Sequence, residues 1–543
     1  MISTNAKRDA LANLELKPEK PGEVDAQPDS TTGYVVGFKL ASILGSVSLA
    51  CFLMLLDTMV ISTAIPSITD TFNSLPDIGW YASAYQFGSA APQPLTGKVY
   101  THFNTKWSFL FFFGVFEIGS LLCGAALSSN MLIIGRAVAG FGAAGIINGA
   151  LTIISSCVPM KRRPALIGLT MGLTQLGVIA GPLIGGAFTS YTTWRWCFYI
   201  NLPLGIVPTA TLLLVQIPEQ TPKRSPVAIM SKLHKYLDLI GFALFSASVL
   251  QLLLALQYGG SQYLWNSSRV IGLFCGSIVT FIVWILWNHC KGEDALMPAS
   301  MVRQREVWSS GLYQSLVVSA MYGATFYLPI YFQAINQATA ILSGVYLLPA
   351  ILSQLVAAGL SGLLLQKIGY VIPLAIFGTV LLSIGSGIFS ILQPGSPIKL
   401  WVGLQILTGT GAGLSMQLAI MTVQAVVGGE LLSSGMAFVI FAQSLGPAII
   451  LVLCNVIFSA SLSTQLQERA PQANAEAILS AGATGFRAIL KPGDLPGVLL
   501  AYANSVGRVF YLVASVASAS VLVLWGMGWR DIRKGGVNVT NNV

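Results

Sequence analysis

Long apolar runs separated by short polar breaks fill most of this 543-residue chain. A bilayer core of roughly 30 Å is crossed by a helix of about 20 apolar residues. Runs of that length, ended by charge or by clusters of Pro, Gly and Asn, are therefore predicted to span a membrane. Fourteen segments qualify, at residues 41–65, 78–99, 107–127, 132–156, 165–188, 196–216, 238–257, 269–289, 309–332, 341–364, 371–392, 400–424, 433–460 and 505–528. The pattern predicts an all-α integral membrane protein.

Charges in the loops predict how these spans are oriented, because short cytoplasmic loops carry an excess of Lys and Arg. With the N-terminus inside, the short outside loops hold only Arg195, Arg269 and Lys399. The predicted cytoplasmic loops hold many more basic residues, namely Lys98, Lys106, Lys161, Arg162, Arg163, Lys223, Arg224, Lys232, Lys235, Lys291, Arg303, Arg305 and Lys367. The C-terminus then returns to the cytoplasm, and the long connection 461–504 is predicted to be an outside loop with short helices.

Composition agrees with residence in lipid. The chain is 54% hydrophobic and only 9% charged, whereas a soluble domain carries about 25% charged residues. The net charge of +9 is interpreted as loop asymmetry, so no nucleic acid partner is expected. Seven scattered cysteines and three histidines lack the spacing of a metal site or a disulfide framework. No phosphate loop is present, so we expect no enzyme, no cofactor and no ATP-driven pump, and energy should come from an ion gradient.

Weak internal repeats divide the chain into two halves. Three ordered pairs of motifs lie eight spans apart: TGKVYTHFNTKW and SGLLLQKIGY, GRAVAGFGAAG and LTGTGAGLSM, QLGVIAGP and QSLGP. Two six-helix halves with two helices inserted between them would give this spacing. The predicted domains are a disordered cytoplasmic tail at 1–36, an N-terminal six-helix bundle at 37–216, a linker with two inserted helices at 217–305, a C-terminal six-helix bundle at 306–529 that includes the outside loop 461–504, and a cytoplasmic tail at 530–543.

Three ionisable residues lie at membrane depth: Asp57 in the first span, Glu117 in the third and Arg136 in the fourth. A charge there costs roughly 2.5–3.5 kcal/mol on insertion scales, so such residues usually face a cavity or a partner. All three are candidates for proton coupling. The alternatives are an aqueous vestibule beside Asp57, a purely structural pair of Asp57 with Arg136, and a polar helix contact for Glu117.

Uncharged polar and aromatic residues in the spans mark a candidate substrate cavity. Such a lining suits neutral or amphipathic organic molecules, held by apolar contact and a few orienting hydrogen bonds. For each single Gln the alternative is a hydrogen bond between helices. The candidates are Gln86, Asn148, Gln175, Gln314, Tyr322, Gln333, Gln417 and Gln443.

One sequon falls in a predicted outside loop. Asn266 begins Asn266-Ser267-Ser268, whereas Asn538 begins a sequon on the predicted inside. Asn266 is therefore the candidate glycosylation site, although a sequon so near the membrane often stays unused.

The fifth span carries the string GLTQLGVIAGPLIGG, which places small residues at four-residue spacing on one face and a helix-bending proline. This string resembles the antiporter motif of the major facilitator superfamily. Together with LLDTMVISTAIP, GRAVAGFGAAG, WRWCFYINLPLG and YLPIYFQAINQATAILSGVYLLP, it is similar to the fourteen-helix drug:proton antiporters over most of residues 40–530. The resemblance extends to fungal members that export mycotoxins and other secondary metabolites.

The resemblance implies a major facilitator fold with 14 transmembrane helices, arranged as six, two and six. It implies that Arg136 is the basic residue of the fourth-helix motif thought to take part in proton transfer, and that Asp57 is the first-helix acidic residue. It also implies that one group of small residues forms the interface that favours export: Gly177, Gly181, Pro182, Gly185 and Gly186.

The loop after the second span departs from the family pattern. Gly97, Lys98 and Lys106 correspond to the cytoplasmic gate, but Thr101 stands at the usual acidic place and His102 at a basic one. An ion-paired latch therefore cannot be assumed.

These features predict a proton-coupled antiporter that exports amphipathic small organic molecules by alternating access, with drug, toxin or secondary-metabolite efflux as its role. We expect a monomer in the plasma membrane, with the vacuolar membrane as a second location, and the bilayer, protons and a small molecule as its partners. A siderophore or vacuolar basic amino-acid carrier of the same fold is the main alternative, although a basic substrate calls for more carboxylates than Asp57 and Glu117. A non-transporting membrane sensor is the alternative from another class.

Overall fold

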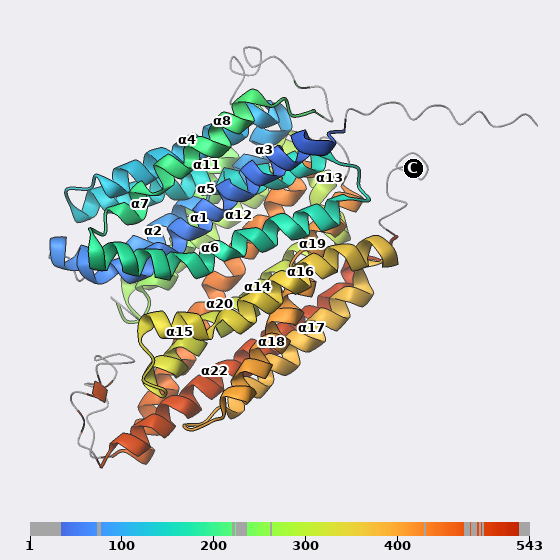
Figure 1. Ribbon diagram of the computed structural model, residues 1–543. Coiled ribbons are helices and arrows are strands. Elements are labelled where there is room, and N and C mark those ends of the chain that lie inside the picture. The colour runs from blue at the N-terminus through green and yellow to red at the C-terminus, as the bar shows by residue number, and fades with distance from the viewer. Residues whose placement is uncertain are drawn as a thin grey trace, which may run out of the picture. The chain divides into compact units, whose positions relative to one another are not determined.

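The computed structural model describes residues 34–72, 78–219, 223, 236–260, 263–427, 431–471, 478, 486–487, 490 and 493–531. The chain divides into Met1–Tyr34 and a unit Val35–Val543, and the following concerns the second unit. It is built of long helices joined by short loops (Figure 1). Within the described residues, 13 helices are long and apolar enough to cross a membrane.

The first six predicted spans form one group of packed helices. The second span is missing from the 13 because it is broken in two at Ala91 and Pro92, where a proline lacks the N–H that continues a helix. The helices are α1 (Gly37–Phe72), α2 (Ile78–Ala90), α3 (Gln93–His102), α4 (Thr105–Gly124), α5 (Ser129–Cys157), α6 (Arg163–Tyr191), α7 (Trp196–Tyr199) and α8 (Asn201–Leu214).

Two further helices follow the first group, in the stretch where the repeat pattern led us to expect an insertion. They are α11 (Leu239–Tyr258) and α12 (Ser268–Lys291), which lie behind the first group in Figure 1. They pack on one another through a reciprocal pair of hydrogen bonds: Ser248 Oγ donates to the carbonyl of Ser277 at 3.0 Å, and Ser277 Oγ donates to the carbonyl of Ser248 at 2.8 Å. α11 also contacts α2 and α20.

The last six predicted spans form the second group. Its helices are α14 (Arg305–Ala334), α15 (Ala340–Tyr346), α16 (Leu348–Ile368), α17 (Val371–Ile388), α18 (Ile398–Ser415), α19 (Leu418–Val426), α20 (Leu432–Arg469) and α22 (Leu495–Val523), with α13 (Ala299–Val302) before them. The predicted loop 461–504 is therefore shorter at both ends. Polar residues after Ala460 end the apolar run, but Leu462 and Leu466 are buried and continue the packed face of α20.

The two groups meet tightly at the end predicted to be cytoplasmic, where α3 contacts α20 and α6 contacts α16. Glycines permit both contacts. A Cβ on Gly97 would lie 2.8 Å from the Cα of Ser434, and a Cβ on Gly362 would lie 2.5 Å from the carbonyl oxygen of Pro164. Real side chains do not fit at such distances, so the helices approach this closely only because these positions lack a side chain.

Candidate functional site

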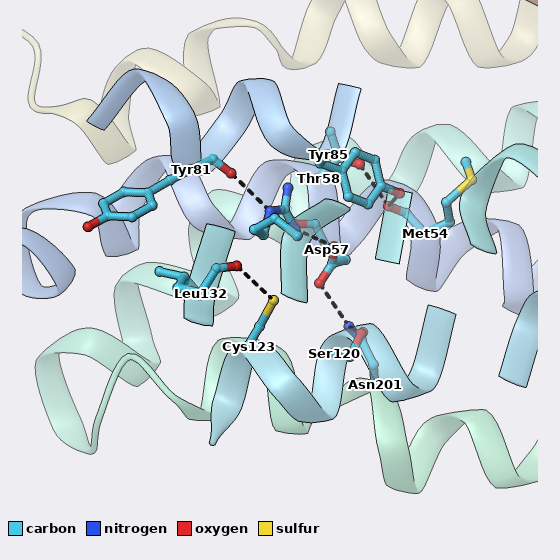
Figure 2. Close-up of polar contacts among 10 residues, drawn as sticks. Met54, Asp57, Thr58, Tyr81, Tyr85, Ser120, Cys123, Leu132 and Asn201 are labelled. Carbon is cyan, nitrogen blue, oxygen red and sulfur yellow. Dashed lines mark hydrogen bonds and ion pairs between the residues drawn. The ribbon is translucent and has the colours of Figure 1, made fainter. Parts of the chain in front are cut away.

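A buried ion pair joins α1 to α5. Arg136 Nη1 lies 2.6 Å from Asp57 Oδ2, and the two side chains are 1% and 0% exposed. Arg136 Nε donates to the carbonyl of Tyr81 at 3.0 Å, and the guanidinium carbon lies 4.4 Å from the ring centroid of Tyr85. Figure 2 shows Tyr81, Tyr85 and Asp57 gathered from neighbouring helices. Both charges are therefore paired and further hydrogen-bonded or stacked, as buried charges must be.

A glycine sets the distance between α5 and α2. Gly140 lies one turn after Arg136, and a Cβ there would be 2.2 Å from the carbonyl oxygen of Tyr85. The glycine-rich string in the fourth span thus lets α5 bring its arginine against the ring of Tyr85.

Two uncharged residues complete the ion-pair cluster, by which we mean Asp57, Arg136, Tyr85, Asn201 and Ser120. Asn201 Nδ2 donates to Asp57 Oδ1 at 3.1 Å and lies 3.1 Å from Ser120 Oγ, as Figure 2 shows. The sequence prediction missed both residues because it took its proton-coupling candidates only from ionisable residues. The available signal was the motif WRWCFYINLPLG, which contains Asn201.

Glu117 lies on α4, three residues before Ser120, but outside the ion pair. Both carboxyl oxygens are buried, and within the described part of the chain they have no hydrogen-bond partner. The carboxyl group packs on α8 at Gly205, where a Cβ would lie 2.2 Å from Oε1. A buried carboxylate must be paired or neutralised; Asp57 is paired and Glu117 is not.

A cavity of about 700 Å³ lies between the two groups of helices, within the size range of sites for drug-sized ligands. Its described lining contains no Asp, Glu, Lys, Arg or His. Five predicted substrate residues line it, namely Gln86, Gln175, Tyr322, Gln417 and Gln443. The lining also includes residues that the sequence prediction did not single out, among them Met54, Gln93, Gln257, Trp265 and Asn455.

The other three predicted substrate residues lie outside this cavity and join helices. Asn148 donates to Thr96 Oγ1 at 3.0 Å, between α5 and α3. Gln333 donates to Ser343 Oγ at 2.9 Å, between α14 and α15. Gln314 donates to the carbonyl of Met416 and to Gln443 Oε1, each at 2.9 Å, so it holds one of the residues that line the cavity.

Tyr85 connects the cavity to the ion pair. Its side chain lines the cavity, while its ring also contacts the guanidinium of Arg136. A single aromatic ring therefore separates a bound molecule from the buried charges. Cation–π contacts of this kind are worth about 2 kcal/mol when desolvated.

The predicted antiporter motif lies on α6 against α1. A Cβ on Gly177 would lie 2.7 Å from the carbonyl oxygen of Phe52, and a Cβ on Gly181 would lie 2.5 Å from the Cβ of Met59. The motif therefore packs directly on the segment of α1 that carries Asp57. The remaining motif residues, Pro182, Gly185 and Gly186, continue along α6.

The family's latch uses an acidic residue at the position where this chain has Thr101. Here, contacts with helix ends hold the loop between α3 and α4 instead. Lys106 Nζ donates to two carbonyls at the C-terminal end of α8, at 2.8 and 3.0 Å. Glu219 accepts from the backbone N–H of Thr105 at 2.6 Å, at the N-terminus of α4. Both charges match the helix dipoles that they meet. Lys98 is buried within α3, and Gly97 forms the close contact to α20.

Asn266 is exposed in the turn that precedes α12. The next residue, Ser267, caps that helix by accepting from the N–H of Val270 at 3.3 Å. The candidate glycosylation site thus lies on the loop between the two inserted helices.

The helices and the central cavity define a multi-pass membrane transporter, and comparison with known proteins supports this class. Residues 47–451 match the family described as the Major Facilitator Superfamily. The chain belongs to that family. The predictions of a major facilitator fold and of a transporter rather than an enzyme are confirmed.

Similar proteins include fungal transporters. The chain is 52% identical over 506 residues to the MFS-type transporter pigP of Monascus ruber, covering 93% of this chain and 89% of that protein. It is 43% identical over 524 residues to the efflux pump mlcE of Penicillium citrinum, covering 95% of each.

Solved structures share the fold. The proton:xylose symporter XylE, bound to 6-bromo-6-deoxy-D-glucose, matches with a TM-score of 0.57 at 14% identity, covering 91% of this chain and 98% of that one. An inward-facing bacterial homologue of the human lysosomal transporter Spinster matches with a TM-score of 0.53 at 15% identity, with the same coverage.

Proposed function

We propose that this protein exports neutral or amphipathic small organic molecules by alternating access, in exchange for protons. Two observations support export of such molecules. The similar protein mlcE of Penicillium citrinum is named an efflux pump. The described lining of the cavity is uncharged and combines Met, aromatic and Gln side chains, which suits apolar contact with a few orienting hydrogen bonds.

The proposed coupling between protons and export rests on the buried ion pair of Asp57 and Arg136. Only the ring of Tyr85 separates this ion pair from the cavity. Asp57 holds Arg136 at 2.6 Å, and Arg136 lies against Tyr85 in the cavity wall. A proton that binds Asp57 removes the counter-charge of Arg136. The guanidinium must then find other partners, and the ring of Tyr85 moves with it. Proton binding at Asp57 is thereby linked to release of the ligand, because Tyr85 contacts Arg136 and also lines the cavity.

The packing between the two groups supports alternating access. The close contacts at Gly97 and Gly362 seal the end predicted to be cytoplasmic. The cavity lining extends the other way, to Asn455 and Ser459 of α20 and to Trp265 of the loop between α11 and α12. With the orientation that the loop charges predict, this arrangement is an outward-facing state. Rocking of the two groups about the cavity then exposes it to the other side.

The lining argues against a basic substrate. A carrier of basic amino acids needs carboxylates beside its ligand, and the described cavity wall has none. Asp57 is already paired with Arg136. We propose that the protein acts in the plasma membrane, because export from the cell requires that location. We propose a monomer, because a single chain supplies the cavity lining from both groups of helices.

The test is efflux from proteoliposomes of defined orientation under an imposed pH gradient, with the neutral dye Nile red as the transported probe. We expect dye movement against its gradient in the wild-type protein. The double variant Asp57→Asn, Arg136→Ala should lose this gradient-driven movement while it still inserts and binds dye. A double variant that exports as well as wild type would show that the coupling assignment is wrong.

A matched control separates lost coupling from lost fold. Gln333→Leu alters a polar contact of α14 outside the cavity and should keep gradient-driven export. Wild-type protein that moves no probe under any gradient would overturn export itself.

A further inference from the structure

The two inserted helices reach the central cavity. The cavity wall includes several residues from α11 and from the loop after it: Leu253, Leu256, Gln257, Gly259, Gly260 and Trp265. α11 packs against α2 of the first group and α20 of the second. The insertion therefore lies beside both groups and forms a third wall of the cavity.

Hydrogen bonds join the described residues on the two sides of the turn after α11. The N–H of Gly260 donates to the carbonyl of Tyr263 at 2.9 Å, and the N–H of Tyr263 donates to the carbonyl of Tyr258 at 3.0 Å. Gly260 has φ +73°, a conformation that glycine adopts without steric cost. Tyr258 and Tyr263 also stack edge to face, with centroids 5.7 Å apart. These contacts tie Tyr263, just before Trp265, to the C-terminal end of α11.

The indole of Trp265 lies on this turn. A Cβ on Gly259 would be 2.3 Å from the indole ring, and a Cβ on Gly260 would be 2.7 Å from Nε1. A side chain at either position would displace the ring, so the indole packs here only because both positions are glycine. The indole remains 39% exposed and lines the cavity. One side of the indole therefore packs on the glycine pair, and part of its surface is open to the cavity.

A second aromatic contact anchors the turn to α2. The rings of Trp80 and Tyr258 meet edge to face with centroids 5.9 Å apart. Trp80 in turn meets Phe87, which lines the cavity, at 5.9 Å. Aromatic contacts therefore join α2 to Tyr258, the residue before the glycine pair on which Trp265 packs.

We propose that Trp265 is a specificity-determining residue that binds the planar face of a neutral aromatic or polycyclic molecule. A held aromatic ring loses little freedom on binding and favours stacked or edge-on contact with another ring system. The uncharged lining around it excludes selection by charge. This inference rests on the proposed function only in that the cavity holds the transported molecule.

The test is equilibrium binding of Nile red to purified full-length protein in lipid nanodiscs, followed by fluorescence polarisation with empty nanodiscs subtracted. Trp265→Ala should raise Kd about two- to tenfold, the range expected for one lost aromatic contact. Trp265→Phe should restore most of the affinity. Leu264→Ala is the matched control, because Leu264 is the adjacent residue, is 75% exposed and does not line the cavity.

A second variant guards against a misfolded Trp265→Ala protein. Leu256→Ala removes another wall residue of α11 that does not contact the indole of Trp265 through the glycine pair, and it should weaken binding in the same direction. If Trp265→Ala elutes as wild type on size exclusion and binds Nile red as Leu264→Ala does, the inference is wrong. Wild-type protein that binds no Nile red also overturns it. Because binding needs no gradient, failure of proton-driven export alone would instead count against the proposed function.

Discussion

The two groups of helices hold different polar clusters around the same cavity. The N-terminal group has the ion-pair cluster, in which Asp57 and Arg136 are almost fully buried. The C-terminal group has an amide cluster, in which Gln314 donates to Gln443 Oε1 and to the carbonyl of Met416. One cluster can change charge when a proton binds. The other can only exchange hydrogen bonds.

The difference suggests that the two halves of the repeated fold have different roles. Removing one partner of a buried ion pair costs about 3–5 kcal/mol, whereas hydrogen bonds between membrane helices average about 0.6 kcal/mol and reach about 1.7. We therefore propose that the N-terminal cluster is the part that drives the conformational change. The C-terminal cluster orients Gln443 in the cavity wall at low cost.

The largest expected effect is on the N-terminal cluster. Arg136→Leu leaves the carboxylate of Asp57 buried and unpaired, so we expect a loss of about 3–5 kcal/mol in stability. Adding Asp57→Asn should restore most of it, because the uncompensated charge is gone. Thermal unfolding followed by size-exclusion fluorescence measures both. A double variant that is less stable than Arg136→Leu alone would show that the ion pair is not the source of the loss.

The next effect concerns the ring between the cavity and the ion pair. Tyr85→Leu removes a cation–π contact worth about 2 kcal/mol, so gradient-driven export should fall about tenfold or more. Tyr85→Phe keeps the ring and should keep most of the export. Phe87→Leu is the matched control, since Phe87 also lines the cavity from α2. Equal losses for Tyr85→Leu and Phe87→Leu would mean that the ring only shapes the cavity.

The architecture was largely predictable from the sequence because length and hydropathy decide which segments can cross a bilayer. The break in the second span was not foreseen, since Pro92 interrupts a run whose composition is otherwise continuous. Likewise α20 continues past Ala460, where burial of Leu462 and Leu466 outweighs the polar residues around them. Local composition does not report which face of a helix will be covered.

The candidate site was predictable where a residue type is rare in membranes. Asp57 and Arg136 stand out because charges at that depth are costly. Asn201 did not stand out, because an amide near a span end is common. Trp265 lies outside the predicted spans, and only the packing of α11 against both groups brings it to the cavity. Gln314 was predicted to line the cavity, but instead holds a residue that does.

A smaller effect is expected in the C-terminal cluster. Gln314→Leu should cost about 0.6–1.7 kcal/mol in stability and weaken Nile red binding, because Gln443 loses its partner. Export should remain driven by the pH gradient. Gln333→Leu on the same helix removes a hydrogen bond away from the cavity and should leave dye binding unchanged. If export by Gln314→Leu no longer depended on the pH gradient, the C-terminal cluster would also take part in coupling. The proposed difference between the two clusters would then be wrong.

The smallest effect on stability is expected at Glu117. Its carboxyl oxygens have no hydrogen-bond partner within the described residues, so Glu117→Gln keeps the shape and breaks no contact. Stability should stay within about 0.5 kcal/mol of wild type. Gln cannot exchange a proton, however, so a coupling role predicts that export measured across pH becomes flatter. Ser120→Ala is the control on the same helix, because it removes a contact to Asn201 without removing a titratable group. A pH profile in Glu117→Gln that matches wild type would make Glu117 a packing residue against α8, and would leave Asp57 and Arg136 to carry the coupling alone.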